Sequence, residues 1–315
     1  SLIPFQVFLN FVIHVLLGLQ RIKEYNLVGI IRTFIFLILI GIFLLGLGFG
    51  IKSAIIAGVI SSLIAGIILF FRARNIVDGI SFRLNKSYLK DFFLYGIKTY
   101  FGNVLGFLHF RIDMFMINFF LNPIAVGFYS VSVGLSEKLW LISESSGTVL
   151  FPKVASEKDK KRKKEFTPQV CRNVLFITII GAFLLFLLSQ WIIVLFFSEK
   201  FLDSVQPLRI LLIGAIAIGG TRILGNDLLG RGKPMLNTYV NIISVTLNII
   251  LNILLIPKWG IEGAAWATAI SYNFAFAIRI IIYSKVSGNS VKEILIPQRS
   301  DLDLYKHFFV DLRRK

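Results

Sequence analysis

The sequence predicts an all-α integral membrane protein with about nine transmembrane helices. The composition is 56% hydrophobic and only 16% charged, whereas a soluble domain is about 25% charged. Apolar runs long enough to cross a bilayer recur along the chain, and the loops between them alternate between poor and rich in Lys and Arg. These observations exclude a soluble enzyme, a disordered segment and a secreted disulfide scaffold. Cys171 is the only cysteine, which excludes an internal disulfide and a cysteine-based metal site, and we expect no metal.

The length of each apolar run places the helices. A helix crosses the hydrocarbon core with roughly 17–25 residues. Runs of this length predict helices at residues 2–19, 27–48, 53–71, 92–118, 124–150, 171–197, 206–229, 234–256 and 261–283.

The loop charges give the orientation. The net charge is +17, and its Lys and Arg residues gather in alternate loops and in the C-terminal tail. Because such loops stay in the cytoplasm, the C-terminus is expected inside. The run Lys158–Lys164 is expected to bind anionic lipid head groups, with about 1 kcal/mol per cation. This topology explains the positive charge, so we expect no nucleic-acid partner.

Polar residues recur on one face of several predicted helices. Inserting an ionisable side chain at the centre of a membrane helix costs at least about 2.5–3.5 kcal/mol of free energy, so such residues need an explanation. They are Gln6, Asn10 and His14 in the first helix, Lys98, His109 and Asp113 in the fourth, Glu137, Lys138 and Glu144 in the fifth, Arg222 and Asn226 in the seventh, and Asn237, Asn241, Asn248 and Asn252 in the eighth. One shared water-filled cavity with a locally cationic lining satisfies them most simply. For the asparagine ladder of the eighth helix, hydrogen bonding between helices explains the pattern equally well.

The segment 95–134 combines an R-x-D stretch, Arg111 and Asp113, with the later turn Gly127–Ser130. Together with segments 147–156, 208–237 and 247–272, it resembles the O-antigen and capsule repeat-unit flippases. This polysaccharide flippase family belongs to the multidrug/oligosaccharidyl-lipid/polysaccharide (MOP) exporter superfamily. The resemblance covers residues from about 1 to 285.

The resemblance implies a transporter with about twelve to fourteen helices in two lobes, of which this chain lacks roughly three at its N-terminus. The second half of the N-terminal lobe, with three helices, is then expected at residues 1–71, followed by a cytoplasmic linker at 72–91. Residues 92–284 would form the six-helix C-terminal lobe, and 285–315 a basic cytoplasmic tail.

The resemblance also implies a function that is not enzymatic. The substrate would be a polyprenyl-diphosphate-linked oligosaccharide, moved by alternating access from the cytoplasmic to the outer leaflet of the cell membrane. Lys98 or Arg222 would anchor the diphosphate, and the asparagines would replace the water around the sugars. A proton or Na⁺ at Asp113, Glu137 or Glu144, with His109, would assist the return step, and no other cofactor is expected. Polysaccharide polymerases and glycosyltransferases are the expected protein partners.

The R-x-D stretch predicts two different orientations. Arg111 and Asp113 lie two residues apart and do not face each other on a helix, so Arg111 is expected to reach the outer head groups while Asp113 faces inward.

Three other functions compete with the flippase. They are a cation-coupled multidrug exporter of the same superfamily, a membrane glycosyltransferase or acyltransferase, and a scaffold without transport activity.

Overall fold

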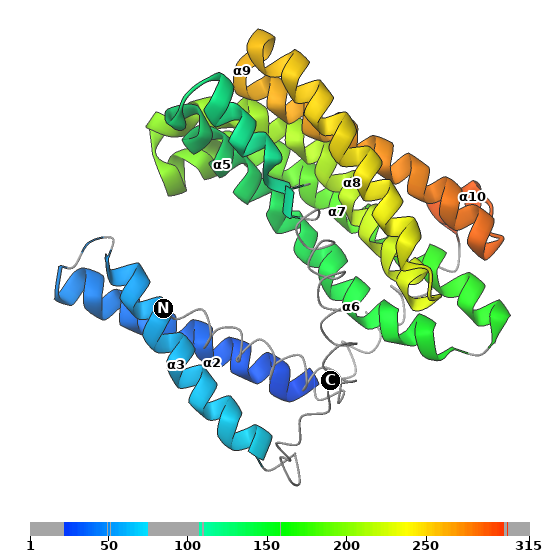
Figure 1. The fold of residues 1–315 in the computed structure, drawn as a ribbon, viewed down its shortest axis with the longest axis horizontal. Helices are drawn as coiled ribbons and strands as arrows, with labels where there is room; N and C mark the ends of the chain where they lie inside the picture. The colour runs from blue at the N-terminus through cyan, green and yellow to red at the C-terminus, as the bar shows by residue number, and fades with distance from the viewer. Residues whose placement is uncertain are drawn as a thin grey trace, which may run out of the picture. The chain divides into compact units, whose positions relative to one another are not determined.

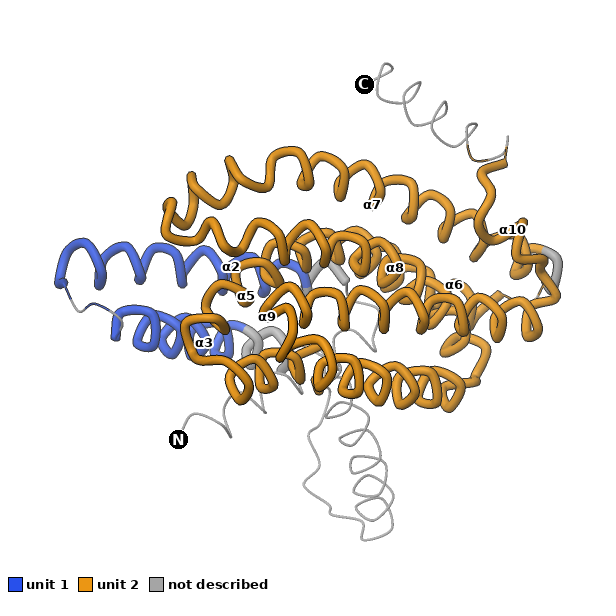
Figure 2. Tube along the Cα trace, turned by 90° about the horizontal axis from the view of Figure 1, so that it is seen from above, with its two compact units in different colours: residues 1–89 blue, residues 90–315 orange. Residues whose placement is uncertain are grey.

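The computed structural model describes residues 22–48, 50, 52–74, 107–108, 110–157, 159–298 and 301. Within these residues all regular secondary structure is helical, as predicted (Figure 1). The chain divides into two compact units, residues 1–89 and 90–315 (Figure 2). The division falls inside the predicted linker, and the assignment of the units to transporter lobes stays a prediction.

The described part of unit 1 contains two helices that pack against each other. They are α2 (Ile22–Gly41), which a π-helical turn η1 (Ile42–Gly46) extends, and α3 (Lys52–Arg74). Helix α3 buries small residues at every fourth position, namely Ser53, Ala57, Ser61 and Ala65. Small side chains of this kind let membrane helices approach closely.

Unit 2 is a helical bundle around α8 (Val205–Gly230). The helix at residues 110–120 precedes α5 (Pro123–Ser136), a 3-10 turn η2 (Glu137–Leu139) and α6 (Trp140–Ser156). The other described elements of unit 2 are α7 (Lys160–Phe197), the 3-10 segment η3 (Glu199–Ser204), α9 (Pro234–Ser287) and α10 (Val291–Leu295). Most of α8 is buried, whereas α7 and α9 expose much of their apolar surface, as helices that face lipid do.

The described residues contain four helices that are long and apolar enough to cross a membrane, and the predicted number of nine stays a prediction. One predicted boundary matches a local backbone feature, and one predicted helix differs from the observed elements. Helix α9 contains a non-helical residue at Gly260 (φ 56°), so its two halves correspond to the predicted helices 234–256 and 261–283. A positive φ favours glycine, which has no Cβ. The single helix predicted at 124–150 is instead interrupted by η2 and ends at Ser156.

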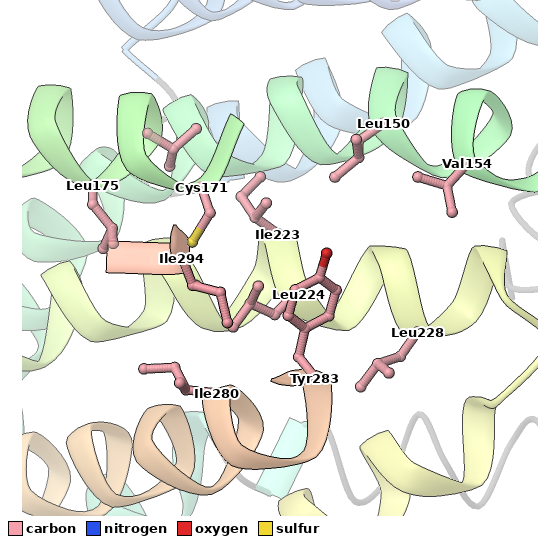
Figure 3. Packing of buried hydrophobic residues seen from close by; sticks show 11 residues of the cluster. Leu150, Val154, Cys171, Leu175, Ile223, Leu224, Leu228, Ile280, Tyr283 and Ile294 are labelled. Atoms are coloured by element: carbon pink, nitrogen blue, oxygen red, sulfur yellow. The ribbon is translucent and has the colours of Figure 1, made fainter. Parts of the chain in front are cut away.

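The main core joins α6, α7, α8 and the second half of α9 (Figure 3). Leu224 and Leu228 of α8 are fully buried there beside Cys171 of α7 and Tyr283 of α9. Ile294 of α10 is also fully buried in this cluster. The short helix α10 is therefore part of the bundle's packing, although it lies in the segment predicted as a basic tail.

A buried ion pair holds the chain beyond α10 against α7. The Nε of Arg172 lies 2.6 Å from Oδ2 of Asp301, and its Nη2 lies 2.8 Å from Oδ1. Arg172 also donates to the carbonyl of Glu293 in α10. Burial alone would raise the pKa of Asp301, but the hydrogen bonds from Arg172 and from the Gln298 amide hold that pKa below its usual value. Asp301 is therefore ionised at neutral pH.

Replacing Asp301 with Asn should detach α10, because it leaves the buried Arg172 charge without its partner. Loss of one partner of a buried pair costs about 3–5 kcal/mol. The lowered pKa of Asp301 means that its contribution is complete above its unfolded-state pKa, about 3.9, and is lost only as pH falls through the lower native value. Hydrogen exchange of residues 284–298 should thus accelerate in Asp301→Asn at neutral pH, while the wild type keeps its protection at mildly acidic pH. The exposed Lys292→Gln is the control, and equal protection in both variants would contradict the prediction.

Candidate functional site

A network of buried polar side chains crosses unit 2 around Asp113, which is 4% exposed. One carboxylate oxygen accepts hydrogen bonds from the hydroxyls of Tyr129 at 2.6 Å and Thr268 at 3.3 Å. The other accepts from the Met114 amide at 2.8 Å. Asn248 donates to Thr268 at 3.2 Å and accepts from Asn252 at 2.9 Å. Within the described residues, the donors to the Asp113 carboxylate are all neutral.

The local sequence explains how these residues meet. Asn122 accepts a hydrogen bond from the Ala125 amide and caps the start of α5, with Pro123 in its first turn. The short connection folds α5 back along the helix at 110–120, so that Tyr129 reaches Asp113. The turn at Gly260 folds the second half of α9 back along the first half. Thr268 of the second half therefore lies beside Asn248 of the first.

A second carboxylate on the same side of unit 2 is paired with an arginine. The Arg111 guanidinium donates to both oxygens of Glu137, at 2.5 and 3.1 Å. The expectation that Arg111 extends to the outer head groups is therefore wrong. The 3-10 turn that begins at Glu137 brings its carboxylate to Arg111, and a bidentate pair compensates a partly buried guanidinium.

The ion pair between Arg222 and Glu144 is more exposed than the one between Arg111 and Glu137, because the Glu144 side chain lies largely at the surface. The Nη1 of Arg222 lies 3.4 Å from Oε1 of Glu144, whose side chain is 63% exposed. The Arg222 guanidinium also lies 4.8 Å above the ring of Trp140 and 5.9 Å from that of Phe110. Arg222 of α8 therefore packs against the rings of Trp140 and Phe110 and forms a weak ion pair with Glu144.

Asp113 and Glu137 both line a small cavity. Its other walls include Ser136 and Thr268 and the rings of Phe110, Trp140 and Tyr272. Its volume is about 10 Å³, which is room for about one water molecule. Carboxylates, hydroxyls and aromatic faces therefore meet around a point where a small cation or a water can be held. The wide cavity predicted for the whole transporter stays a prediction.

The asparagine ladder and its neighbours make contacts between and within helices. Asn237 donates to the carbonyl of Gly225 at 2.9 Å, and Asn241 accepts from Arg279 at 3.1 Å. Asn226 packs so closely on Gly147 that a Cβ there would lie 2.2 Å from its Nδ2. Lys138 is exposed. The predicted residues Gln6, Asn10, His14, Lys98 and His109 lie outside the residues that the structure describes.

Sequence reasoning missed several residues of this region. Tyr129 is the residue before the polar Ser130, and Thr268 and Tyr272 carry hydroxyls in an otherwise apolar run. Arg279 is 5% exposed and donates to the carbonyl of Thr221 at 3.3 Å as well as to Asn241. A charged residue in the middle of an apolar run was the available signal for Arg279.

Comparison with known proteins assigns the family. Residues 5–206 match the family described as polysaccharide biosynthesis protein. The chain belongs to this family. It is 27% identical to a "probable low-salt glycan biosynthesis flippase" of Haloferax volcanii, over 71% of the chain and 48% of that relative. The predicted flippase family is thereby confirmed.

Solved structures show the same fold. The lipid II flippase MurJ in an inward closed conformation matches with a TM-score of 0.64 and 20% identity, over 84% of this chain and 56% of that one. A MOP superfamily transporter from Pyrococcus furiosus matches with a TM-score of 0.75 and 15% identity, over 90% of this chain and 67% of that one. The polysaccharide biosynthesis family member described here thus has the fold of MOP transporters. The chain spans about half the length of the curated relatives it matches.

The Asp113 network predicts strong coupling between Asp113 and Tyr129. Tyr129→Phe removes a donor from a buried carboxylate, so it should destabilise the protein by about 1.5–3 kcal/mol. In an Asp113→Asn background the same change should cost clearly less, because the charge is gone. Thermal unfolding of the four proteins of this cycle measures the difference. The control is Ser145→Ala, which removes an exposed hydroxyl, and strictly additive effects of the two substitutions would exclude an ionised Asp113.

Proposed function

We propose that this protein takes part in flipping a polyprenyl-diphosphate-linked oligosaccharide from the cytoplasmic to the outer leaflet of the cell membrane, for the synthesis of a surface polysaccharide. The observation that carries the proposal is the buried Asp113 carboxylate with its hydrogen-bond donors, together with the partly exposed Arg222–Glu144 pair, on a bundle of apolar helices with a transporter fold. The relative from Haloferax is named as a glycan biosynthesis flippase, and MurJ as a flippase of lipid II.

Arg222 is the described residue best suited to hold the diphosphate. Its guanidinium presents a planar set of donors that matches phosphate oxygens. Its present partner, Glu144, is largely exposed, and such a pair is worth only about 0–1 kcal/mol. A phosphate can therefore replace Glu144 at small cost. Lys98 and Lys138 remain proposed as further cations of the same binding surface.

The sugars require hydrogen bonds because each hydroxyl would otherwise lose its water partners inside the membrane. Asn226, Asn237, Asn241, Asn248 and Asn252 are proposed to supply them when the helices rearrange during alternating access. Gln6, Asn10 and His14, which lie outside the described residues, stay predicted as further sugar ligands. The side chains of Asn237, Asn241 and Asn248 already form hydrogen bonds within the bundle. Sugar binding would replace these hydrogen bonds with hydrogen bonds to sugar hydroxyls.

We assign the coupling ion, H⁺ or Na⁺, to Asp113, with Glu137, Glu144 and His109 as accessory groups. The membrane potential drives a negative head group outward by about 2.3 kcal/mol per charge per 100 mV. The coupling ion is assigned to the return step, in which the helices rearrange without a bound substrate. A cation on Asp113, whose donors among the described residues are all neutral, would compensate the buried carboxylate without breaking an existing ion pair.

The proposed orientation places the start of α7 and the C-terminus in the cytoplasm, with Lys158–Lys164 on anionic head groups. Polymerases and glycosyltransferases of polysaccharide synthesis are the proposed protein partners. Export of organic cations is the second candidate function, because aromatic rings and carboxylates lie together beside Asp113.

The first test replaces Arg222 in the full-length protein. Arg222→Gln should reduce surface glycan by about tenfold in cells that lack their own flippase, because one charge-assisted phosphate contact is lost. Arg222→Lys keeps the charge and should retain part of the activity. Arg209→Gln, on the same helix, is the control. Full complementation by Arg222→Gln at equal protein levels would refute the assignment.

The second test addresses coupling. Asp113→Asn should abolish the dependence of flipping on pH or on Na⁺ in vesicles, because an amide binds neither ion strongly. The measurement follows transfer of a labelled lipid-linked sugar across a range of pH and Na⁺ concentrations. If a triple variant without the carboxylates of Asp113, Glu137 and Glu144 kept the wild-type dependence, the ion site would lie elsewhere.

A further inference from the structure

We propose that α10 is an interfacial anchor, whose exposed apolar side chains enter the cytoplasmic leaflet while neighbouring lysines contact anionic lipid head groups. These apolar side chains, Val291, Leu295 and Ile296, form the α10 face. The partner of the α10 face is thus a lipid surface, and this role is independent of the transported substrate.

Helix α7 locates the edge of the membrane. From Asn173 to Phe197 it contains no charged residue, and about 20 residues suffice to span the hydrocarbon core. Arg172, the residue before this stretch, therefore lies at one edge of the core. The basic run Lys158–Lys164 precedes Arg172, so this edge is the one on the proposed cytoplasmic side.

Contacts with α7 place α10 at the same level. Arg172 donates to the carbonyl of Glu293, and Ile294 lies with Cys171 in one buried cluster (Figure 3). The turn before α10 is fixed as well, because the side-chain amide of Asn289 donates to a carbonyl of α7 at 3.1 Å. The helix α10 therefore lies at the membrane edge, beside the residue that marks it.

The α10 face is apolar and exposed at this level. Val291 is 44% exposed, Leu295 36% and Ile296 55%. Val291 and Leu295 are four residues apart, so they point to the same side of the helix. Ile294 is fully buried, which holds α10 against the bundle and leaves the α10 face outside. Apolar side chains exposed at the membrane edge gain free energy when they enter the lipid.

The charged residues of segment 284–298 favour an anionic surface. Lys285 and Lys292 are exposed. The carboxylate of Glu293 accepts a hydrogen bond from the Ser290 amide at 2.6 Å and thereby caps α10. The free charges of this segment are therefore positive, as the head groups of an anionic leaflet require. Long lysine side chains can reach those head groups while the neighbouring apolar residues insert.

The end of α9 shows that lipid extends to the neighbourhood of α10. Ile281 is 53% exposed within the helix predicted to cross the membrane at 261–283. Lys285 lies one helical turn further on the same side. Ile281 therefore faces hydrocarbon and Lys285 the head groups. The leaflet that covers Ile281 can also cover the α10 face, so no second protein is needed there.

The experiment measures the depth of spin labels in the full-length protein, reconstituted into phosphatidylcholine vesicles with or without phosphatidylglycerol. The buried Cys171 is replaced by Ala, and single cysteines are then introduced for labelling. These variants are Val291→Cys, Leu295→Cys and Ile296→Cys. Two reference positions are Ile281→Cys in the membrane and Arg162→Cys on the exposed start of α7.

Labels on the α10 face should be several-fold more accessible to oxygen, relative to a water-soluble nickel chelate, than the label at Arg162→Cys. Their ratio should approach that of Ile281→Cys, because oxygen concentrates in the hydrocarbon. Phosphatidylglycerol should place the labels deeper, and high salt should reverse this change, because it screens the lysines from the head groups.

Each variant is compared only when its melting temperature equals that of its parent. A ratio at all three positions equal to that of Arg162→Cys would overturn the proposal. Magnetic coupling between labels of two copies would also overturn it, because the α10 face would then join two proteins. Equal depth in both kinds of vesicle would exclude the role of the lysines. The measurement requires no substrate, so its failure leaves the proposed function untouched.

Discussion

The burial of the Asp113 carboxylate is the constraint on which the arrangement of unit 2 depends. A carboxylate that is 4% exposed among apolar helices is tolerated only when hydrogen-bond donors surround it. Those donors come from α5 and from the second half of α9. The Asn122 cap and the turn at Gly260 are therefore parts of the same arrangement, because each returns the chain so that a hydroxyl reaches Asp113.

Three arginines of unit 2 are compensated in three different ways. Arg111 holds a carboxylate with two hydrogen bonds, Arg222 shares its charge between rings and an exposed Glu144, and Arg279 lies among neutral oxygens. The bidentate pair and the buried arginine are fixed by packing. The Arg222 contacts are the most easily exchanged of the three, since the carboxylate partner Glu144 lies 3.4 Å away and is 63% exposed. This gradation separates supporting charges from the one suited to meet a ligand.

Hydropathy alone located most of the described helices, because a bilayer imposes a length on each apolar run. It also separated the two halves of α9, where Pro257 and Gly260 interrupt the run. The contacts between helices were not predictable in this way. Glu137 was recognised as a polar residue on a helix face, but its partner depends on a 3-10 turn that no sequence pattern marked. Tyr129 and Thr268 were missed because a single hydroxyl hardly changes the hydropathy of a helix.

The ion pair between Arg172 and Asp301 joins positions 129 residues apart in the chain. At about 5–20 residues per second, the ribosome needs roughly 6–26 seconds to make that interval. Throughout this time Asp301 has not been synthesised, and the Arg172 guanidinium at the basic end of α7 lacks this partner. During synthesis the bundle therefore passes through an interval in which water or anionic head groups surround a guanidinium that a carboxylate of the same chain surrounds later.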